Sequence, residues 1–465
     1  MKRMLLVLLI LGLTAFQSRH YFRPDFPYTH DGENHLARFA NYKVAIKEGQ
    51  IPPRFAPNLM NHYGYPVFNF NYPLANISSL PLSFIKLNPE LSFKLIAMVS
   101  FIFGMAGVWK LTHFFKLEMF PSSLAILLFG LNPYFTNLLL YRGNIGELMA
   151  LCFLPWLVYS IHHIEKVNKF SWYWIAVWAL FFLSHNLSVV LFTPWLLIYG
   201  AVVSWKKKEV FLKILLTIIS AFLLTTWFWL PAVFEAKYTV VQQANLAKDF
   251  LLHFPTFSQL LFGQMQFGFS IPGPIDTLSF QLGLAQLLVF SVVAFFIVQK
   301  IFKDKKIDRL NLFLVLTGVF AIYLQLSMST WFWSLFSGLQ ILQFPWRLSA
   351  FFVILIPLMW CYFAKELRTP QYSIVLAFLI MQMLLIFKLA PADFFHRQQI
   401  DYDLYTQSTS TQNENRAKDF TYLEIGDWKP APAVPTNATL SVESWTGSAR
   451  LYSLTMLQEG RVTEP

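Results

Sequence analysis

Acidic, imidazole and guanidinium side chains follow one another early in the chain, at Asp31, Glu33, His35 and Arg38. If a helix begins at Gly32, then Asp31, His35 and Arg38 share one face of it, because they are spaced i, i+4 and i+7. A carboxylate in such a group can act as a general base toward a hydroxyl. Asp31 is therefore the first candidate catalytic residue, with Glu33 as the neighbouring candidate and the other two as substrate-binding candidates.

The same side chains allow other interpretations. Asp31 together with His35, or with Glu33, can hold a divalent cation, since carboxylate oxygens and imidazole nitrogens are common ligands of such ions. Alternatively, Asp31 caps the amino terminus of the helix and His35 packs against aromatic rings. The residues by themselves leave these possibilities open.

A second carboxylate, Glu147, stands near the start of an apolar stretch and follows Arg142 and Asn144. Ionisable residues at membrane level are costly and are usually functional. Glu147 is therefore a second catalytic candidate, and Arg142 and Asn144 are candidates for binding substrate. Two structural explanations also exist: Glu147 is favoured by the positive end of the helix dipole, or it forms an ion pair with Arg142.

Further polar residues are expected near the same membrane surface. Arg54, Arg142 and Arg347 can bind a phosphate, because a guanidinium group makes bidentate contacts with phosphate oxygens. The alternative for Arg347 is that it extends toward lipid headgroups. His185 ends an apolar stretch and is a weaker substrate-binding candidate, since a single histidine there is more often structural.

The composition requires a lipid environment for the elements that carry these residues. Of 465 residues, 56% are hydrophobic and only 13% are charged, whereas soluble domains have about 25% charged residues. The net charge of +11 suits loops that face anionic lipid, and no basic module typical of nucleic-acid binding is present. Cys152 and Cys361 lie inside apolar stretches and are expected to be small core residues.

The hydropathy pattern predicts an all-α polytopic membrane protein with about eleven transmembrane helices of about 20 residues each. The first, at 2–17, is expected to remain uncleaved. The other predicted spans are 91–111, 119–140, 147–164, 171–184, 187–204, 210–230, 278–299, 310–328, 346–364 and 371–389.

Basic residues predict the orientation of these spans. With the amino terminus in the cytoplasm, all the predicted cytoplasmic connections are short and basic, as the positive-inside rule requires. These connections are Lys110–Lys116, His162–Lys169, Trp205–Glu209, Lys300–Arg309 and Lys365–Arg368. The predicted location is the plasma (inner) membrane, with the large loops and the carboxyl terminus on the outer side.

Two domains are expected. Residues 1–389 form the membrane domain, which includes a first outer loop at 18–88 and a large outer loop at 231–277. Residues 390–465 form a small extracytoplasmic tail, with a Ser/Thr/Gln/Asn-rich linker at Gln407–Asn415 and strand-like segments at Ala438–Ser444 and Ala449–Met456. Nearly all the loop and tail residues that could form a site are therefore expected on the outer side of the membrane.

This order of elements resembles the GT-C membrane glycosyltransferases, which take sugars from polyprenyl-phosphate carriers. More closely, the chain resembles the bacterial family labelled "6-pyruvoyl-tetrahydropterin synthase-related, membrane domain", over about residues 1 to 430. The matching stretches are His30-Asp31, His35-Leu-Ala-Arg38, Glu48-Gly-Gln-Ile-Pro-Pro-Arg54, Tyr63-Gly-Tyr-Pro66, Tyr141-Arg-Gly-Asn-Ile-Gly-Glu147, Ser184-His-Asn186, Phe228-Trp-Leu-Pro231, Gln343-Phe-Pro-Trp-Arg347 and Tyr422-Leu-Glu424.

The GT-C resemblance implies that the base is the acid of the first loop, here Asp31 with Glu33 beside it, and that Glu147 is the second acid. The sequence departs from the family pattern because Gly32 separates two acids that are often adjacent. The family also implies a polyprenyl-phosphate sugar donor, and a glycan, lipid or protein acceptor of the cell envelope.

The expected function is therefore a membrane glycosyltransferase (a hexosyl- or pentosyltransferase) acting at the outer membrane face, with a divalent cation as a possible cofactor. Two alternatives from other classes remain. One is a transporter or flippase of lipid-linked glycans, and the other is a non-catalytic scaffold for envelope assembly. Transporters usually place charges at the bilayer midplane within repeated halves, whereas these acids lie at loop level and no internal repeat is detected.

Overall fold

The computed structural model of the chain describes residues 2–242, 249–273, 275–304, 308–367, 369–410, 414–416, 418, 438–446 and 450–456. Several sequence-based expectations lie outside these residues: the Tyr422-Leu-Glu424 match, the basic residues Lys305, Lys306 and Arg368, and part of the Gln407–Asn415 linker.

The chain divides into two compact units, each made of segments far apart in the sequence. Unit 1 comprises Met1–Gly32, Lys94–Thr225 and Asn245–His396. Unit 2 comprises Glu33–Phe93, Thr226–Ala244 and Arg397–Pro465. The predicted division between a membrane domain ending at residue 389 and a tail stays a prediction.

Unit 1 consists almost entirely of helices. Its α-helices are α1 (Lys2–Gln17), α5 (Pro89–Phe114, from Lys94 onward), α6 (Met119–Gly130), α7 (Pro133–Asn137), α8 (Ile145–Val167), α9 (Trp172–Phe182), α10 (Asn186–Val203), α11 (Lys208–Leu224), α13 (Phe257–Phe262), α14 (Leu284–Asp304), α15 (Arg309–Gln325), α16 (Thr330–Leu335), α17 (Phe351–Phe363) and α18 (Thr369–Phe387). Its short 3₁₀-helices are η1 (Arg19–Phe22), η6 (Asp249–Leu252), η7 (Ser327–Ser329), η8 (Ser337–Leu342), η9 (Pro345–Ala350) and η10 (Ala364–Glu366), and η2 (Leu138–Arg142) is a π-helical turn. A two-residue strand pair joins β1 (Phe26–Pro27) to β2 (Phe394–Phe395).

Within the described residues, six helices are long and apolar enough to cross a membrane, or up to nine if each of three bent pairs is one span. One of the bent pairs joins α6 to α7 and η2, and another joins α15 to η7 and α16. The helices α1 and α9 are apolar but shorter. This architecture fits an all-α, multi-pass membrane protein, and the finer count of eleven spans stays a prediction.

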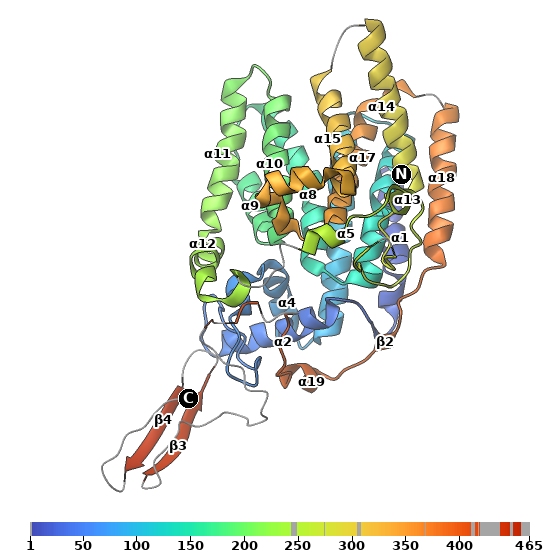
Figure 1. Cartoon of the computed structure of the whole chain (residues 1–465). Coiled ribbons are helices and arrows are strands. Elements are labelled where there is room, and N and C mark those ends of the chain that lie inside the picture. The colour runs from blue at the N-terminus through green and yellow to red at the C-terminus, as the bar shows by residue number, and fades with distance from the viewer. Residues whose placement is uncertain are drawn as a thin grey trace. The chain divides into compact units, whose positions relative to one another are not determined.

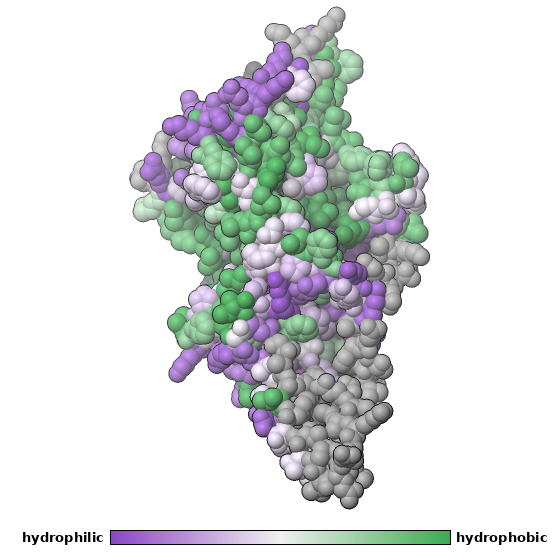
Figure 2. Space-filling model, turned by 90° about the vertical axis from the view of Figure 1, so that its left-hand side faces the viewer, coloured by the Kyte–Doolittle hydropathy of each residue, from purple (hydrophilic) through white to green (hydrophobic). Residues whose placement is uncertain are grey.

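The outer helices of unit 1 expose large apolar side chains. On α11 these include Leu216, Leu223 and Leu224, and on α18 they include Leu384 and Phe387. Figure 2 shows a broad hydrophobic surface beside hydrophilic residues that gather at one end of the helices. Exposing such an apolar surface to water costs free energy, whereas contact with the hydrocarbon chains of lipid does not.

Two helices form the interior of unit 1. In both α8 and the span that contains α17, 89% of the apolar 18-residue stretch is buried. Around them, α10 packs against α8, while α14 and α15 pack against α17 (Figure 1). Polar side chains on α8 and on the segment before α17 are therefore held inside packed protein.

Unit 2 consists of shorter helices and of strands near the carboxyl terminus. Its helices are α2 (Gly32–Lys47, from Glu33 onward), α3 (Val67–Phe70), α4 (Leu74–Phe84), α12 (Thr226–Glu235), η3 (Ala236–Tyr238), η4 (Val240–Gln242) and α19 (Gln399–Asp403). A buried cluster that includes Tyr42, Leu59, Tyr65 and Phe68 forms a core. The strands β3 (Ala438–Trp445) and β4 (Arg450–Met456) pair as an antiparallel hairpin. The extracytoplasmic location and the β character of the tail as a whole stay predictions.

Candidate functional site

The turn before α8 positions the segment that contains His30 and Asp31. The π-helical turn η2 ends at Gly143, which has a φ of 64°. The backbone amides of His30 and Asp31 donate hydrogen bonds to the carbonyl oxygens of Tyr141 (3.0 Å) and Arg142 (2.8 Å). These bonds hold the segment before α2 against the turn before α8, although more than a hundred residues separate them in the sequence.

Gly143 cannot be replaced without strain at this junction. Its positive φ is rarely adopted by other residues, and an added Cβ would lie 2.2 Å from Oγ1 of Thr29. We expect Gly143→Ala to lower the free energy of unfolding by about 2 kcal/mol or more, because backbone strain and the steric clash add.

Gly49→Ala is the matched control. Gly49 has a φ of 87° but no atom within 4 Å of a built Cβ, so its replacement should cost about 1 kcal/mol from backbone strain alone. Equilibrium unfolding of the two purified variants in detergent compares the two effects. Equal losses would show that the Thr29 contact contributes nothing.

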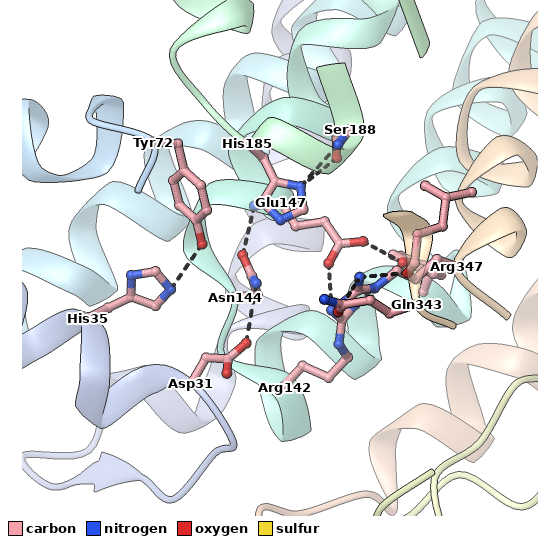
Figure 3. Close-up of polar contacts among 12 residues, drawn as sticks. Asp31, His35, Tyr72, Arg142, Asn144, Glu147, His185, Ser188, Gln343 and Arg347 are labelled. Atoms are coloured by element: carbon pink, nitrogen blue, oxygen red, sulfur yellow. Dashed lines mark hydrogen bonds and ion pairs between the residues drawn. The ribbon is translucent and has the colours of Figure 1, made fainter. Parts of the chain in front are cut away.

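Asp31 and Glu147 are connected through one amide side chain. Nδ2 of Asn144 donates to Oδ2 of Asp31 at 3.2 Å, while Oδ1 of Asn144 caps α8 by accepting the backbone N–H of Glu147 at 3.0 Å (Figure 3). Within the described part of the chain, Asn144 is the one hydrogen-bond partner of the Asp31 carboxylate. The second oxygen of Asp31, Oδ1, therefore remains able to accept a proton.

A buried ion pair lies beside this connection. The guanidinium of Arg142 contacts Oε2 of Glu147 at 2.6 Å, and both side chains are almost completely buried. The hydroxyl of Tyr134 on α7 donates to Oε1 of Glu147 and accepts from Arg142 at 3.3 Å. Arg142 also lies over the ring of Trp346 at 5.0 Å. Glu147 thus neutralises Arg142 and fixes its position.

Arg347 supplies a second guanidinium to the same region. It donates to the carbonyl of Leu342 at 2.8 Å and to Oε1 of Gln343 at 3.4 Å (Figure 3). Its buried Nε atom and the buried Nε1 atom of Trp346 have no hydrogen-bond partner among the described residues. Because unpaired buried donors are costly, each of these two N–H groups is available to donate to an acceptor atom.

Electrostatics link these groups. Arg142, Glu147 and Asp31 are all close enough to Arg347 to interact with its charge. Gln343, which orients Arg347, has a φ of 63°. Such a backbone conformation is uncommon for a residue other than glycine and is concentrated at functional sites. Two cations and two carboxylates therefore lie in one region of unit 1, where Arg142 and Glu147 are buried and Asp31 and Arg347 are partly buried.

Two histidines border the cluster. His185 caps α10, where its Nδ1 atom accepts the backbone N–H of Ser188 at 3.3 Å and contacts Oγ of Ser188 at 2.8 Å. His30 stacks on the ring of Phe269 with a centroid distance of 4.7 Å. Burial lowers the pKa of His30, and although the charge of Asp31 opposes this shift, Arg142 reinforces it. The lowered pKa favours the neutral form of the His30 imidazole beside Asp31.

The other candidate residues from the sequence lie in unit 2. The helix that begins at Gly32 is present as α2. His35 contacts the hydroxyl of Tyr72 at 3.4 Å, and Arg38 donates to the carbonyl of Thr409 at 2.5 Å. Glu33 forms an ion pair with Arg397.

Arg54, also in unit 2, is held by backbone and side-chain acceptors. It donates to Oδ1 of Asn69 at 2.9 Å and to the carbonyl of Trp227 at 2.7 Å. Asn69 in turn donates to Glu235 at 2.8 Å. Each of these unit 2 side chains therefore has partners within its own unit. Within the described residues, no group of three or more His, Cys, Asp or Glu side chains is arranged to hold a metal ion.

Three residues of the cluster did not emerge from the sequence as candidates: Tyr134, Gln343 and Trp346. Gln343 and Trp346 belong to the same short stretch as Arg347. The sequence analysis singled out this stretch but assigned a role only to Arg347. Tyr134 follows Asn132 and Pro133, which are signals for the start of a helix. Nothing local indicates that its hydroxyl contacts Glu147.

Comparison with known proteins places few constraints on the activity. No protein-family model matches the chain. The chain is similar to a protein of Lactococcus lactis subsp. cremoris (strain MG1363) named "Uncharacterized protein", with 25% identity over 251 residues, which are 51% of this chain and 41% of that protein. The matched region thus spans less than half the length of this relative.

Proposed function

We propose that the protein is a membrane glycosyltransferase of the GT-C type that transfers a sugar from a polyprenyl-phosphate-linked donor to an envelope glycan, lipid or protein. The observation that carries this proposal is the position of Asp31. Its carboxylate has one oxygen without a hydrogen bond from the described residues, and it lies within electrostatic reach of both Arg142 and Arg347. This arrangement supports the proposal, because a carboxylate can accept a proton and guanidinium groups can stabilise an anionic leaving group.

In the proposed reaction, the acceptor hydroxyl oxygen attacks the anomeric carbon of the donor sugar. Asp31 takes the hydroxyl proton as the new carbon–oxygen bond forms. The bond between the anomeric carbon and the phosphate oxygen breaks, and the polyprenyl phosphate leaves with the electron pair. Attack opposite to the leaving group inverts the configuration at the anomeric carbon.

Arg347 is the proposed contact for the leaving phosphate. Its Nε–H and the Nε1–H of Trp346 are buried and lack acceptors among the described residues. A phosphate oxygen would satisfy these donors, and a cation in a site with little water stabilises the charge that develops on the leaving group. Because Arg142 is already neutralised by Glu147, we assign it a supporting electrostatic role and assign Glu147 a positioning role.

The remaining substrate-binding candidates fit this proposal less directly. His35, Arg38 and Arg54 belong to unit 2, and they are proposed to contribute to acceptor binding. Asn144 and His185 are proposed to orient groups around Asp31 and Glu147. A divalent cation as cofactor stays a proposal.

The proposal also includes a topology. Eleven spans in the plasma (inner) membrane would leave the amino terminus in the cytoplasm, and the 18–88 and 231–277 loops and the carboxyl terminus outside. Support comes from the carboxyl ends of α10 and α14 and the amino ends of α11 and α15, which lie at the same end of the helices (Figure 1). These ends are flanked by basic residues, including Lys207, Lys300 and Arg309, as the positive-inside rule expects of cytoplasmic loops.

The test is transfer of labelled sugar from native polyprenyl-linked lipid to envelope acceptors, measured in membranes that contain or lack the protein. Transfer that depends on the protein supports the proposal. If membranes of both kinds transfer the same amount while lipid-linked glycan accumulates on the inner leaflet when the protein is absent, the protein is a flippase. If neither transfer nor lipid distribution changes, the enzyme proposal is wrong and a scaffold role is favoured.

A further inference from the structure

A second cavity lies in unit 1, apart from the cluster around Asp31. It has a volume of about 520 Å³ and is lined by residues of several helix ends, including Phe115, His162, Trp205, Arg309 and Tyr362. Pockets that bind small ligands usually have about 300–1,000 Å³. Because the lining comes from the carboxyl ends of α8, α10 and α17 and the amino end of α15, the cavity lies at the basic end of the helices.

The floor of the cavity contains an unusual group of buried polar side chains. Nε2 of His162 lies 2.6 Å from the hydroxyl of Tyr199 and 3.1 Å from the hydroxyl of Tyr362. His162 and Tyr199 are buried, whereas Tyr362 is partly exposed and lines the cavity. The network therefore holds the hydroxyl of Tyr362 in place at the cavity surface, where it can donate to or accept from a ligand.

Arg309 provides a cation that has no carboxylate partner among the described residues. Its guanidinium lies over the indole ring of Trp205 at 4.2 Å, and it forms no ion pair with any carboxylate in the described part of the chain. Stacking on an aromatic face holds a guanidinium in place and leaves its N–H donors available at the edge. A planar fork of free donors in a cavity matches the oxygens of a phosphate.

The carboxylates of the cavity are already engaged. Glu165 forms an ion pair with Lys207. Asp308 caps α15 by accepting the backbone N–H groups of Leu310 at 3.0 Å and Asn311 at 3.4 Å. Asp308 keeps its charge, because its printed donors are uncharged N–H groups, and neither carboxylate forms an ion pair with Arg309 in the described part of the chain. The exposed guanidinium of Arg309 is therefore accessible to an anion that enters the cavity.

We propose that this cavity binds a phosphate group, with Arg309 as the main ligand and the Tyr362 hydroxyl as a second contact. The cavity is larger than a phosphate and has apolar walls such as Phe115 and Val202. A lipid phosphate, with its headgroup at the membrane surface and its first carbons against these walls, fills it best. A soluble phosphate ester has the same charged chemistry. This site does not depend on the proposed glycosyl transfer.

The experiment measures binding of dioctanoyl phosphatidic acid to the full-length protein, purified in a neutral detergent, by native mass spectrometry. The wild type should bind it, and Arg309→Gln should bind it at least about tenfold more weakly, because a hydrogen-bonded charge contributes about 1.5 kcal/mol or more, which corresponds to this factor. Lys303→Gln is the matched control. Lys303 is an exposed residue at the end of α14, outside the cavity lining, so this variant removes the same charge and should bind like the wild type.

Two further ligands separate the possible sources. Dioctanoylglycerol has the same chains without phosphate and should not bind at this site. If glycerol 3-phosphate binds as tightly as phosphatidic acid and also depends on Arg309, the phosphate site is supported and its ligand is soluble. If Arg309→Gln binds phosphatidic acid no more weakly than Lys303→Gln, or if dioctanoylglycerol binds equally well, the proposal is overturned.

Discussion

Asp31→Asn should lower sugar transfer by about 10²–10⁴-fold, because general base catalysis contributes a factor of this size. Asparagine has nearly the shape of aspartate and can still accept a hydrogen bond from Asn144. It cannot take the proton of the acceptor hydroxyl. The loss should therefore appear in kcat, while donor binding changes little. The measurement is transfer of labelled sugar at matched membrane abundance of the two proteins.

Asp25→Asn is the control for this substitution. Asp25 belongs to the same segment of unit 1, and its backbone carbonyl, not its side chain, accepts from Lys94 at 2.9 Å. This variant should transfer sugar at the wild-type rate. If Asp31→Asn does so too in a correctly inserted protein, Asp31 is not the base. Equal loss in the two variants would instead indicate a general effect of charge in this segment.

The second large effect concerns stability. Replacing Glu147 by leucine leaves the Arg142 guanidinium buried without its carboxylate, and breaking a buried ion pair in this way costs about 3–5 kcal/mol. The double variant Arg142→Met/Glu147→Leu removes both charges and should recover much of that loss. The Tyr134 hydroxyl loses its acceptor in both variants, so full recovery is not expected. Equilibrium unfolding in a titration with denaturing detergent measures the differences.

A surface ion pair of the same unit provides the comparison. Lys300 and Glu366 are in contact at 2.6 Å, with side chains that are 47% and 46% exposed. Glu366→Leu should therefore change the free energy of unfolding by less than about 1 kcal/mol. If Glu147→Leu is no more costly than Glu366→Leu, the Arg142–Glu147 pair does not hold the site together. If the double variant is as unstable as Glu147→Leu, the cost does not come from an unpaired Arg142.

The sequence by itself determined the features that depend on neighbouring residues. Long apolar stretches predicted helices that cross a membrane, and the described residues include six helices long and apolar enough to do so, or up to nine if each bent pair is one span. The start of α2 at Gly32 was also expected. Asn144 was proposed only as a substrate-binding residue, although its side chain caps α8. Hydropathy, caps and turns are local properties, because their free energies arise within one or two helical turns.

The tertiary structure alone decided which side chains meet. Trp346 lies over Arg142 although about two hundred residues separate them, and Glu33 pairs with Arg397. For Glu147, the sequence left helix-dipole stabilisation, an ion pair and catalysis open, and packing brought Arg142 and Tyr134 into contact with it. The packing of the helices determines which partner each side chain meets. A buried charge needs such a partner, because leaving it unpaired would cost several kcal/mol.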